Sequence, residues 1–261
     1  SPILPGDYQR SSYPVAVFRW TLTNPTTKPL ELSLLLSWRN TVGWFTNTDS
    51  SAEVHFRDDG SPEHNYAPAI GVGEGQSNRW IDADGLRGVL LDGKRSTPLA
   101  EGEGQWCLAL PDRLDGVELM RCSRWDPSGD GAELARRAGE HASAAIAVNL
   151  TLAPGETREI PVAISWDLPV TSFATGVRDL RRYSDFYGAD GCHAAAIAAE
   201  ALRDWRSWHE QIEAWQAPVL ARKELPEELR MALFNELYDL ASGGSLWTAA
   251  TSKDPYGRFG V

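Results

Sequence analysis

The chain has 261 residues, 42% of them hydrophobic and 23% charged, a balance typical of a globular protein with a sizeable core. Its formal net charge is −11 and it has no dense run of lysine and arginine, so no nucleic-acid partner is expected. No run of about 18 apolar residues occurs, so we expect no transmembrane segment in these residues.

The first part of the chain predicts β-strands. Residues 13–22 are β-branched and aromatic, and residues 30–38 follow them after a turn-forming cluster at 24–29, so we predict that these two strands pair. Three further strands are predicted at residues 87–91, 105–110 and 117–123. Residues 46–79 are rich in Asp, Asn, Ser and Gly, which predicts long loops with at most short strands.

A second pair of strands is predicted at residues 144–152 and 157–166. The sequence Ala153-Pro154-Gly155-Glu156 between them is typical of a turn, so we predict a hairpin. Short strands joined by Gly/Pro turns indicate an antiparallel β-sandwich, here over roughly residues 1–170.

The period becomes helical after Pro169. A helix is predicted at residues 192–216, and Pro218 is expected to close it. One face of this helix carries Ala194, Ala198, Leu202, Trp205, Trp208, Ile212 and Trp215. We interpret this stripe as packing against the sandwich or the next domain rather than contacting a substrate.

A second helix is predicted at residues 226–241. Pro226 suits its first position, Glu227 and Glu228 suit the positive end of the helix dipole, and Gly243-Gly244 is expected to end it.

The second helix places Glu236 among apolar residues. Leu229, Leu233 and Leu240 form the stripe around it, while Met231, Phe234 and Tyr238 form an opposite patch, so we expect burial of both faces. A buried carboxylate must be paired, protonated or directed into a polar cavity, because burial without a partner costs several kcal/mol. Glu236 is therefore either a structural ion-pair residue or a functional carboxylate.

Several segments resemble glycoside hydrolase family 116, which includes the non-lysosomal glucosylceramidase, also called bile acid β-glucosidase. The segment Phe234-Asn235-Glu236-Leu237-Tyr238, with Gly243-Gly244 and Trp247 after it, is similar to the nucleophile segment of that family. Residues 1–5, 13–18, 37–40 and 205–216 are similar to its N-terminal domain and to the helix that leads into its catalytic domain. One departure is Ser242, where many members carry an acid.

The resemblance implies a β-sandwich over residues 1–170, followed by a helical linker and the start of an (α/α)6 catalytic domain over residues 171–261. It implies retaining hydrolysis of a β-glucoside or glucosylceramide, with Glu236 as nucleophile and an acid/base Asp beyond Val261. The chain alone is then expected to be inactive. No cofactor and no metal are expected, while the oligomeric state and peripheral membrane association stay open.

The cysteines Cys107, Cys122 and Cys192 are sparse and show no Cys-x-x-Cys spacing, which argues against a disulfide framework or structural zinc. Reduced thiols in the cytoplasm are expected, with a Cys107–Cys122 pair in an oxidising compartment as the alternative.

The alternative function is a non-catalytic β-sandwich module with a helical tail that binds carbohydrate or another protein.

Other candidate sites are weaker. His55, His64, Asp58 and Asp59 share one region but match no standard metal spacing, and no Gly-x-Ser-x-Gly motif indicates a serine hydrolase.

Overall fold

The computed structural model describes residues 3–43, 55–56, 58–60, 62–63, 75–122, 143–173, 177–235, 237 and 246–260. The chain divides into two compact units. The sandwich unit comprises Pro14–Arg178 and Asp190–Leu202, and the second unit comprises Ser1–Tyr13, Asp179–Ala189 and Arg203–Val261.

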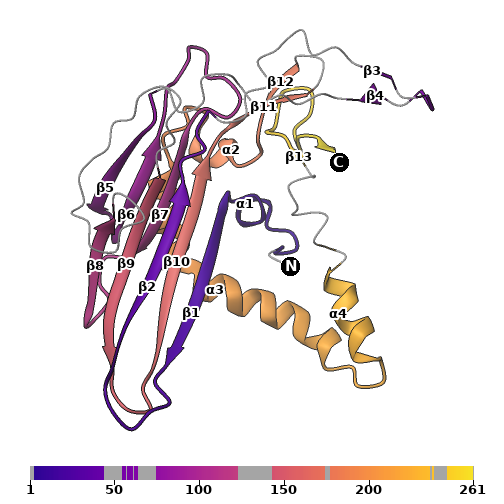
Figure 1. Ribbon diagram of the computed structural model, residues 1–261. Helices are drawn as coiled ribbons and strands as arrows, with labels where there is room; N and C mark the ends of the chain where they lie inside the picture. Colours follow the sequence, from indigo (N-terminus) through magenta and orange to yellow (C-terminus); the bar gives the residue numbers. More distant parts are fainter. Residues whose placement is uncertain are drawn as a thin grey trace. The chain divides into compact units, whose positions relative to one another are not determined.

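The sandwich unit contains two main antiparallel sheets, which confirms the predicted mainly β fold with helices in its C-terminal part (Figure 1). The five-stranded sheet has the order β1 (Val15–Thr23), β10 (Thr157–Asp167), β7 (Gln105–Pro111), β6 (Leu86–Asp92) and β5 (Ser77–Ala83). The three-stranded sheet has the order β2 (Leu30–Arg39), β9 (Ser143–Leu152) and β8 (Val117–Cys122). Shorter strands are β3 (His55–Phe56), β4 (Pro62–Glu63), β11 (Val170–Phe173) and β12 (Val177–Leu180).

The main core contains the facing apolar side chains of the two sheets. In β9, Ile146, Val148 and Leu150 are buried while Asn149 and Thr151 alternate with them on the outer face. Leu108 and Val162 contribute from the five-stranded sheet to the same cluster. This alternation with a period of two residues is why the strands could be recognised in the sequence.

The opposite face of the five-stranded sheet is covered by the first turns of α3 (Ala194–Leu220). Ala194, Ala198 and Leu202 of the helix cluster with Leu90 and Cys107 of the sheet. The predicted apolar stripe is thus buried where the helix begins. Small alanines at these positions let the helix lie close to the strands.

Two predicted strand pairings are wrong. β1 pairs with β10 rather than with β2, and β9 pairs with β2 and β8 rather than with β10. The connection from β1 to β2 and the connection from β9 to β10 each cross from one sheet to the other, and Asn24 holds the two connections together. Its fully buried amide donates to the carbonyl oxygens of Lys28, Leu152 and Ala153 at 2.8, 2.9 and 3.1 Å. The turn residues therefore form two linked arches instead of two hairpins.

Two other details differ from the sequence-based expectations. α3 continues to Leu220 with Pro218 inside its last turn, because the N–H of Ala221 still bonds to the carbonyl of Ala217 at 2.9 Å beyond the proline. β5 begins within the predicted loop region. It joins β6 through Asp84 and Gly85, whose φ values of 56° and 82° define the tight hairpin turn that Asp-Gly favours.

The second unit contains short elements besides the rest of α3. These are α1 (Tyr8–Ser11), α2 (Ser184–Tyr187), α4 (Glu227–Asn235), β13 (Leu246–Trp247) and β14 (Phe259–Gly260). None of the helices in the described part of the chain combines the length and apolar character that crossing a membrane requires.

Candidate functional site

Helix α4 leads directly to Glu236, but Glu236 itself lies outside the described residues. The helix begins as the sequence predicts. Glu227 and Glu228 occupy its first turn, and the carbonyl of Pro226 accepts a hydrogen bond from the N–H of Arg230 at 3.1 Å. Its described part ends at Asn235, whereas the prediction extended to residue 241. The assignment of Glu236 as nucleophile therefore remains a sequence-based prediction.

The apolar side chains of α4 differ in burial. Phe234 is 8% exposed and packs edge-on against Trp215 of α3, with ring centroids 5.4 Å apart. In contrast, Leu229, Met231 and Leu233 are 46%, 50% and 49% exposed. The expectation that both faces are buried is wrong for these three side chains. Leu229 and Leu233 belong to the predicted stripe around Glu236, and Met231 belongs to the opposite patch with Phe234. All three side chains present apolar surface to solvent.

A pocket of about 440 Å³ lies within the second unit, and we call it the Trp247 pocket. Three segments that are distant in sequence form it. Its lining residues are Ile3, Leu4, Pro5, Gly6, Asp7, Tyr8, Ser11, Arg182, Trp247, Tyr256 and Gly257. The sequence did not indicate this pocket, because no local motif links segments so far apart.

The N-terminal wall of the Trp247 pocket is held by its own hydrogen bonds. The hydroxyl of Ser11 lies 3.1 Å from both the N–H and the carbonyl oxygen of Leu4, which closes the segment into a hook. Asp7 caps α1 by accepting a hydrogen bond from the N–H of Arg10 at 2.9 Å. The side chains of Asp7 and Tyr8 are thus presented by a fixed backbone.

The opposite wall is a β-structure that fixes Trp247. The N–H of Arg182 donates to the carbonyl of Trp247 at 2.7 Å, and the indole N–H of Trp247 donates to the carbonyl of Tyr256 at 3.2 Å. Gly257 has a φ of +70°, and a Cβ there would lie 2.0 Å from the carbonyl oxygen of Thr248. Glycine is therefore required for this close turn.

The Trp247 pocket combines aromatic rings with charged groups. The Arg182 guanidinium lies 5.5 Å from the ring centroid of Trp247, and its Nη1 is 3.0 Å from Oδ2 of Asp185. Tyr8 meets Trp247 edge-to-face, with centroids 5.4 Å apart. Such an arrangement offers ring faces and hydrogen-bonding groups to the same ligand.

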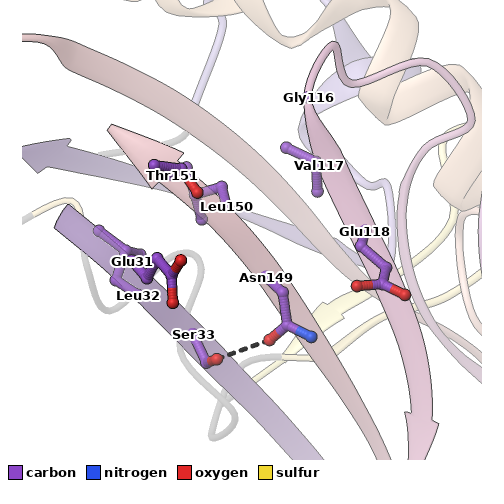
Figure 2. Close-up of a pocket in the computed structure, with 9 residues that line it drawn as sticks. All are labelled: Glu31, Leu32, Ser33, Gly116, Val117, Glu118, Asn149, Leu150 and Thr151. Carbon is purple, nitrogen blue, oxygen red and sulfur yellow. Dashed lines mark hydrogen bonds between the residues drawn. The ribbon is translucent and has the colours of Figure 1, made fainter. Parts of the chain in front are cut away.

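A second, more polar depression of about 760 Å³ lies on the outer face of the three-stranded sheet (Figure 2). The hydroxyl of Ser33 donates to the side-chain oxygen of Asn149 at 2.6 Å, and Glu31 and Glu118 stand on the flanking strands β2 and β8. None of the described residues that line it is aromatic. This surface therefore offers hydrogen bonds and negative charge but no ring to stack on a ligand.

Asp167, Asp190 and His193 come together just before α3, and their potential ligand atoms lie within 4.8 Å of one another. The fully buried Asp167 accepts a hydrogen bond from the N–H of His193 at 2.8 Å, and Asp190 accepts one from the N–H of Cys192 at 3.0 Å. Because both carboxylates are used by backbone donors, we interpret the cluster as fixing the start of the helix. Of the histidines noted in the sequence, His64 lies outside the described residues.

The structure thus defines a two-sheet antiparallel β-sandwich protein that continues into helices, with an aromatic pocket in its second unit. A sequence model described as beta-glucosidase 2, glycosyl-hydrolase family 116 N-term, matches residues 1–208. The chain therefore belongs to glycosyl-hydrolase family 116. The match spans the sandwich strands and more than half of α3, and it ends before Glu236.

Proposed function

We propose that the chain is the N-terminal part of a retaining β-glucosidase in which Glu236 is the nucleophile. The family match over residues 1–208 is the observation that carries this proposal. The resemblance of residues 234–238, Gly243-Gly244 and Trp247 to the family's nucleophile segment supports the residue assignment. Residues 171–261 are proposed to open an (α/α)6 catalytic domain, whose acid/base Asp would lie beyond Val261.

The proposed reaction has two steps. Retaining glycosidases hold two carboxyl groups about 5–5.5 Å apart. In the first step, the Glu236 carboxylate attacks the anomeric carbon while the Asp carboxylic acid protonates the departing glycosidic oxygen. In the second step, the Asp carboxylate takes a proton from water, which displaces Glu236 and releases glucose with its original configuration.

Glucosylceramide is the proposed natural substrate among β-glucosides. The proposal rests on the resemblance to the non-lysosomal glucosylceramidase, and it includes a cytoplasmic location with peripheral access to membranes. Comparing hydrolysis of glucosylceramide in mixed micelles with hydrolysis of an aryl β-glucoside by the parent enzyme tests it. Turnover of the aryl glucoside without turnover of glucosylceramide would refute the lipid substrate but leave the glucosidase proposal in place.

Chemical rescue tests the role of Glu236 in the parent enzyme. A folded Glu236→Gly variant should lose activity on an aryl β-glucoside and regain it with added azide, which enters the space of the missing carboxylate. The product should be the α-glucosyl azide, because one displacement inverts the anomeric carbon. A variant that retains full activity without azide would contradict the assignment. Far-UV circular dichroism of the variant separates lost chemistry from lost folding.

The second candidate is a non-catalytic sandwich module that binds carbohydrate or protein. The polar depression on the outer face of β2, β9 and β8 favours it, since its side chains could bind such a partner. A coding sequence with no catalytic domain downstream of Val261 would support this candidate, and several hundred further residues with helical hairpins would support the glucosidase.

A further inference from the structure

The strands β1 and β2 are end strands of the two sheets, and they lie on the same side of the sandwich. β1 pairs with β10 and β2 pairs with β9, and among the described residues no further strand pairs with either of them. The two arches lie side by side because Asn24 bonds to both, so β1 and β2 flank the same side of β10 and β9. We call this side of the sandwich the open edge.

The inner face of β1 extends beyond the cover that the three-stranded sheet provides. Phe18 and Trp20 pair with Val162 and Ile160 of β10, and paired residues of an antiparallel ladder point to the same face. Val162 and Ile160 are 1% and 0% exposed in the core, whereas Phe18 and Trp20 are 47% and 42% exposed. The cover therefore ends between β10 and β1, and Phe18 and Trp20 form an apolar ledge beside β2.

The backbone of β1 also directs polar groups to the open edge. The carbonyl of Pro14 accepts a hydrogen bond from the N–H of Trp166 at 2.9 Å, so the even-numbered residues of β1 are the ones that bond to β10. The N–H and C=O groups of odd-numbered residues such as Val17 and Thr21 therefore point away from β10. Such an edge is a template for pairing with another strand.

We propose that the open edge is a dimer interface, in which β1 of a second copy lies on the ledge and pairs with β2. A two-fold axis parallel to the strands and midway between the two sheet layers makes this arrangement reciprocal. β1 and β2 run in opposite directions, so β1 of the second copy would be antiparallel to β2 (Figure 1). The three-stranded sheet of each copy then continues into the five-stranded sheet of the other.

A second copy suits the open edge because β1 itself has the side chains that the ledge requires. Phe18, Trp20 and Leu22 lie on the inner face of β1, and they would continue the apolar row that Leu32 and Leu34 form in β2. The four rings of the two ledges would pack against one another. They would remove about 400 Å² from water, roughly a third of the 1,200 Å² at the low end of stable interfaces, before the two added strand pairs are counted.

The charges on the outer faces of the two strands are complementary in this arrangement. The symmetry places the end of the second copy's β1, at Thr23, near the start of β2. It therefore brings Arg19 of the partner subunit toward Glu31 and away from Arg39. Within one copy, Nε of Arg19 lies 3.5 Å from Oε2 of Glu159, so Glu31 would add a second carboxylate to this arginine. Opposite charges on adjacent antiparallel strands stabilise their pairing.

The exposed apolar side chains of α4 are a weaker candidate for self-association. Leu229, Met231 and Leu233 offer apolar area, but a helix offers no strand edge. Association through α4 would therefore leave the backbone hydrogen bonding of β1 unchanged. This difference separates the two surfaces by experiment.

Sedimentation velocity of the 261-residue chain over a range of concentrations tests the proposal. The 28.7 kDa monomer should be in equilibrium with a species of twice its mass and with nothing larger, because a two-fold interface closes on itself. Thr21→Pro removes an N–H that points to the open edge and not to β10, so it should weaken the dimer by about tenfold or more without unfolding the chain. Trp20→Ser should also weaken the dimer, because it removes half of each ledge.

Leu233→Ser is the matched control. Leu233 is 49% exposed on α4, close to the 42% of Trp20, and its replacement should leave the dimer unchanged. Hydrogen exchange gives a second measurement, in which the amides of β1 should exchange more slowly at concentrations that favour the dimer. If Thr21→Pro lowers the melting temperature, Trp20→Ser and the exchange measurement still decide.

Four results would overturn the inference. The first is a monomer at every concentration, and the second is an open series of larger oligomers. The third is a dimer that Leu233→Ser abolishes and Trp20→Ser does not, since that dimer would form through α4. The fourth is a dimer in which the amides of β1 gain no protection.

Discussion

Asn24 is expected to be a principal stabilising residue of the sandwich, and the Asn24→Ala variant tests this. The Asn24 amide donates to the carbonyls of Lys28, Leu152 and Ala153, and its oxygen accepts from the N–H and hydroxyl of Thr26 at 2.9 and 2.7 Å. Of these partners, Leu152 is fully buried and the other three residues are exposed. Water can therefore replace Asn24 at every partner except the Leu152 carbonyl.

The magnitude follows from this difference. A buried polar group left without a partner costs about 1–3 kcal/mol, and a hydrogen bond whose partner can rehydrate contributes about 0.5 kcal/mol at the low end of measured values. One buried carbonyl and four solvent-accessible hydrogen bonds then give a loss of about 3–5 kcal/mol in the free energy of unfolding. For a chain of this size the melting temperature should fall by roughly 10 °C.

Urea unfolding followed by far-UV circular dichroism measures this change. Asn149→Ala is the matched control, because Asn149 lies on the outer face of β9 and is only partly buried. It should cost about 1 kcal/mol or less. An Asn24→Ala chain as stable as the Asn149→Ala chain would refute the view that Asn24 links the two arches.

Three further predictions concern the core and the thiols. In the native chain, iodoacetamide should modify the exposed Cys192 and leave the buried Cys107 unmodified, as peptide mapping would show. Modification of both cysteines at equal rates would contradict the placement of Cys107 in the core. Burial raises the pKa of the Cys107 thiol to about 12, so the unfolded chain loses this proton at lower pH than the folded chain. The free energy of unfolding should therefore fall by about 1.4 kcal/mol per pH unit above pH 9. If urea titrations of a Cys107→Ala chain show the same fall with pH, ionisation of Cys107 is not its cause. Gly88→Ala should abolish soluble folding, because its Cβ would lie 2.2 Å from the backbone oxygen of Leu108. Gly155→Ala is the control: its Cβ would enter open space, and its φ of +73° should cost about 1 kcal/mol in the free energy of unfolding. Similar thermal unfolding of the two variants would show that the strand at Gly88 can shift.

The strands could be predicted from the sequence, but their partners could not. Alternation of apolar and polar residues depends on which face of a sheet each residue occupies, so it located β2 and β9 within a residue or two. Pairing depends on where the chain goes after each turn. A buried Asn24 that bonds to a distant strand leaves no signal in a local pattern, so both turns were interpreted as hairpins.

Helix α3 shows a similar limit at its end. Its apolar stripe was recognised because helical periodicity persists along the segment, and its first turns are buried as expected. Pro218 was expected to stop the helix, yet a proline in the last turn removes only one hydrogen bond when the turn can continue past it. The Asp84-Gly85 turn, in contrast, was a signal that the sequence contained and that could have located β5.

The candidate sites differ in how far the sequence could reveal them. Glu236 could be proposed as nucleophile from the sequence, because the motif that it resembles is contiguous in the chain. The Trp247 pocket joins Tyr8, Arg182 and Trp247 from segments that only the fold brings together. No spacing rule connects such residues before the three-dimensional structure is known.

The most direct test of the proposed function is to identify the residue that forms the glucosyl-enzyme in the parent protein. A 2-deoxy-2-fluoro-β-glucoside with a good leaving group should trap the intermediate, because the fluorine slows its hydrolysis. Proteolysis and mass spectrometry should then find the fluoroglucosyl group on Glu236. A label on another carboxylate, or no covalent label in an enzyme that turns over β-glucosides, would contradict the assignment.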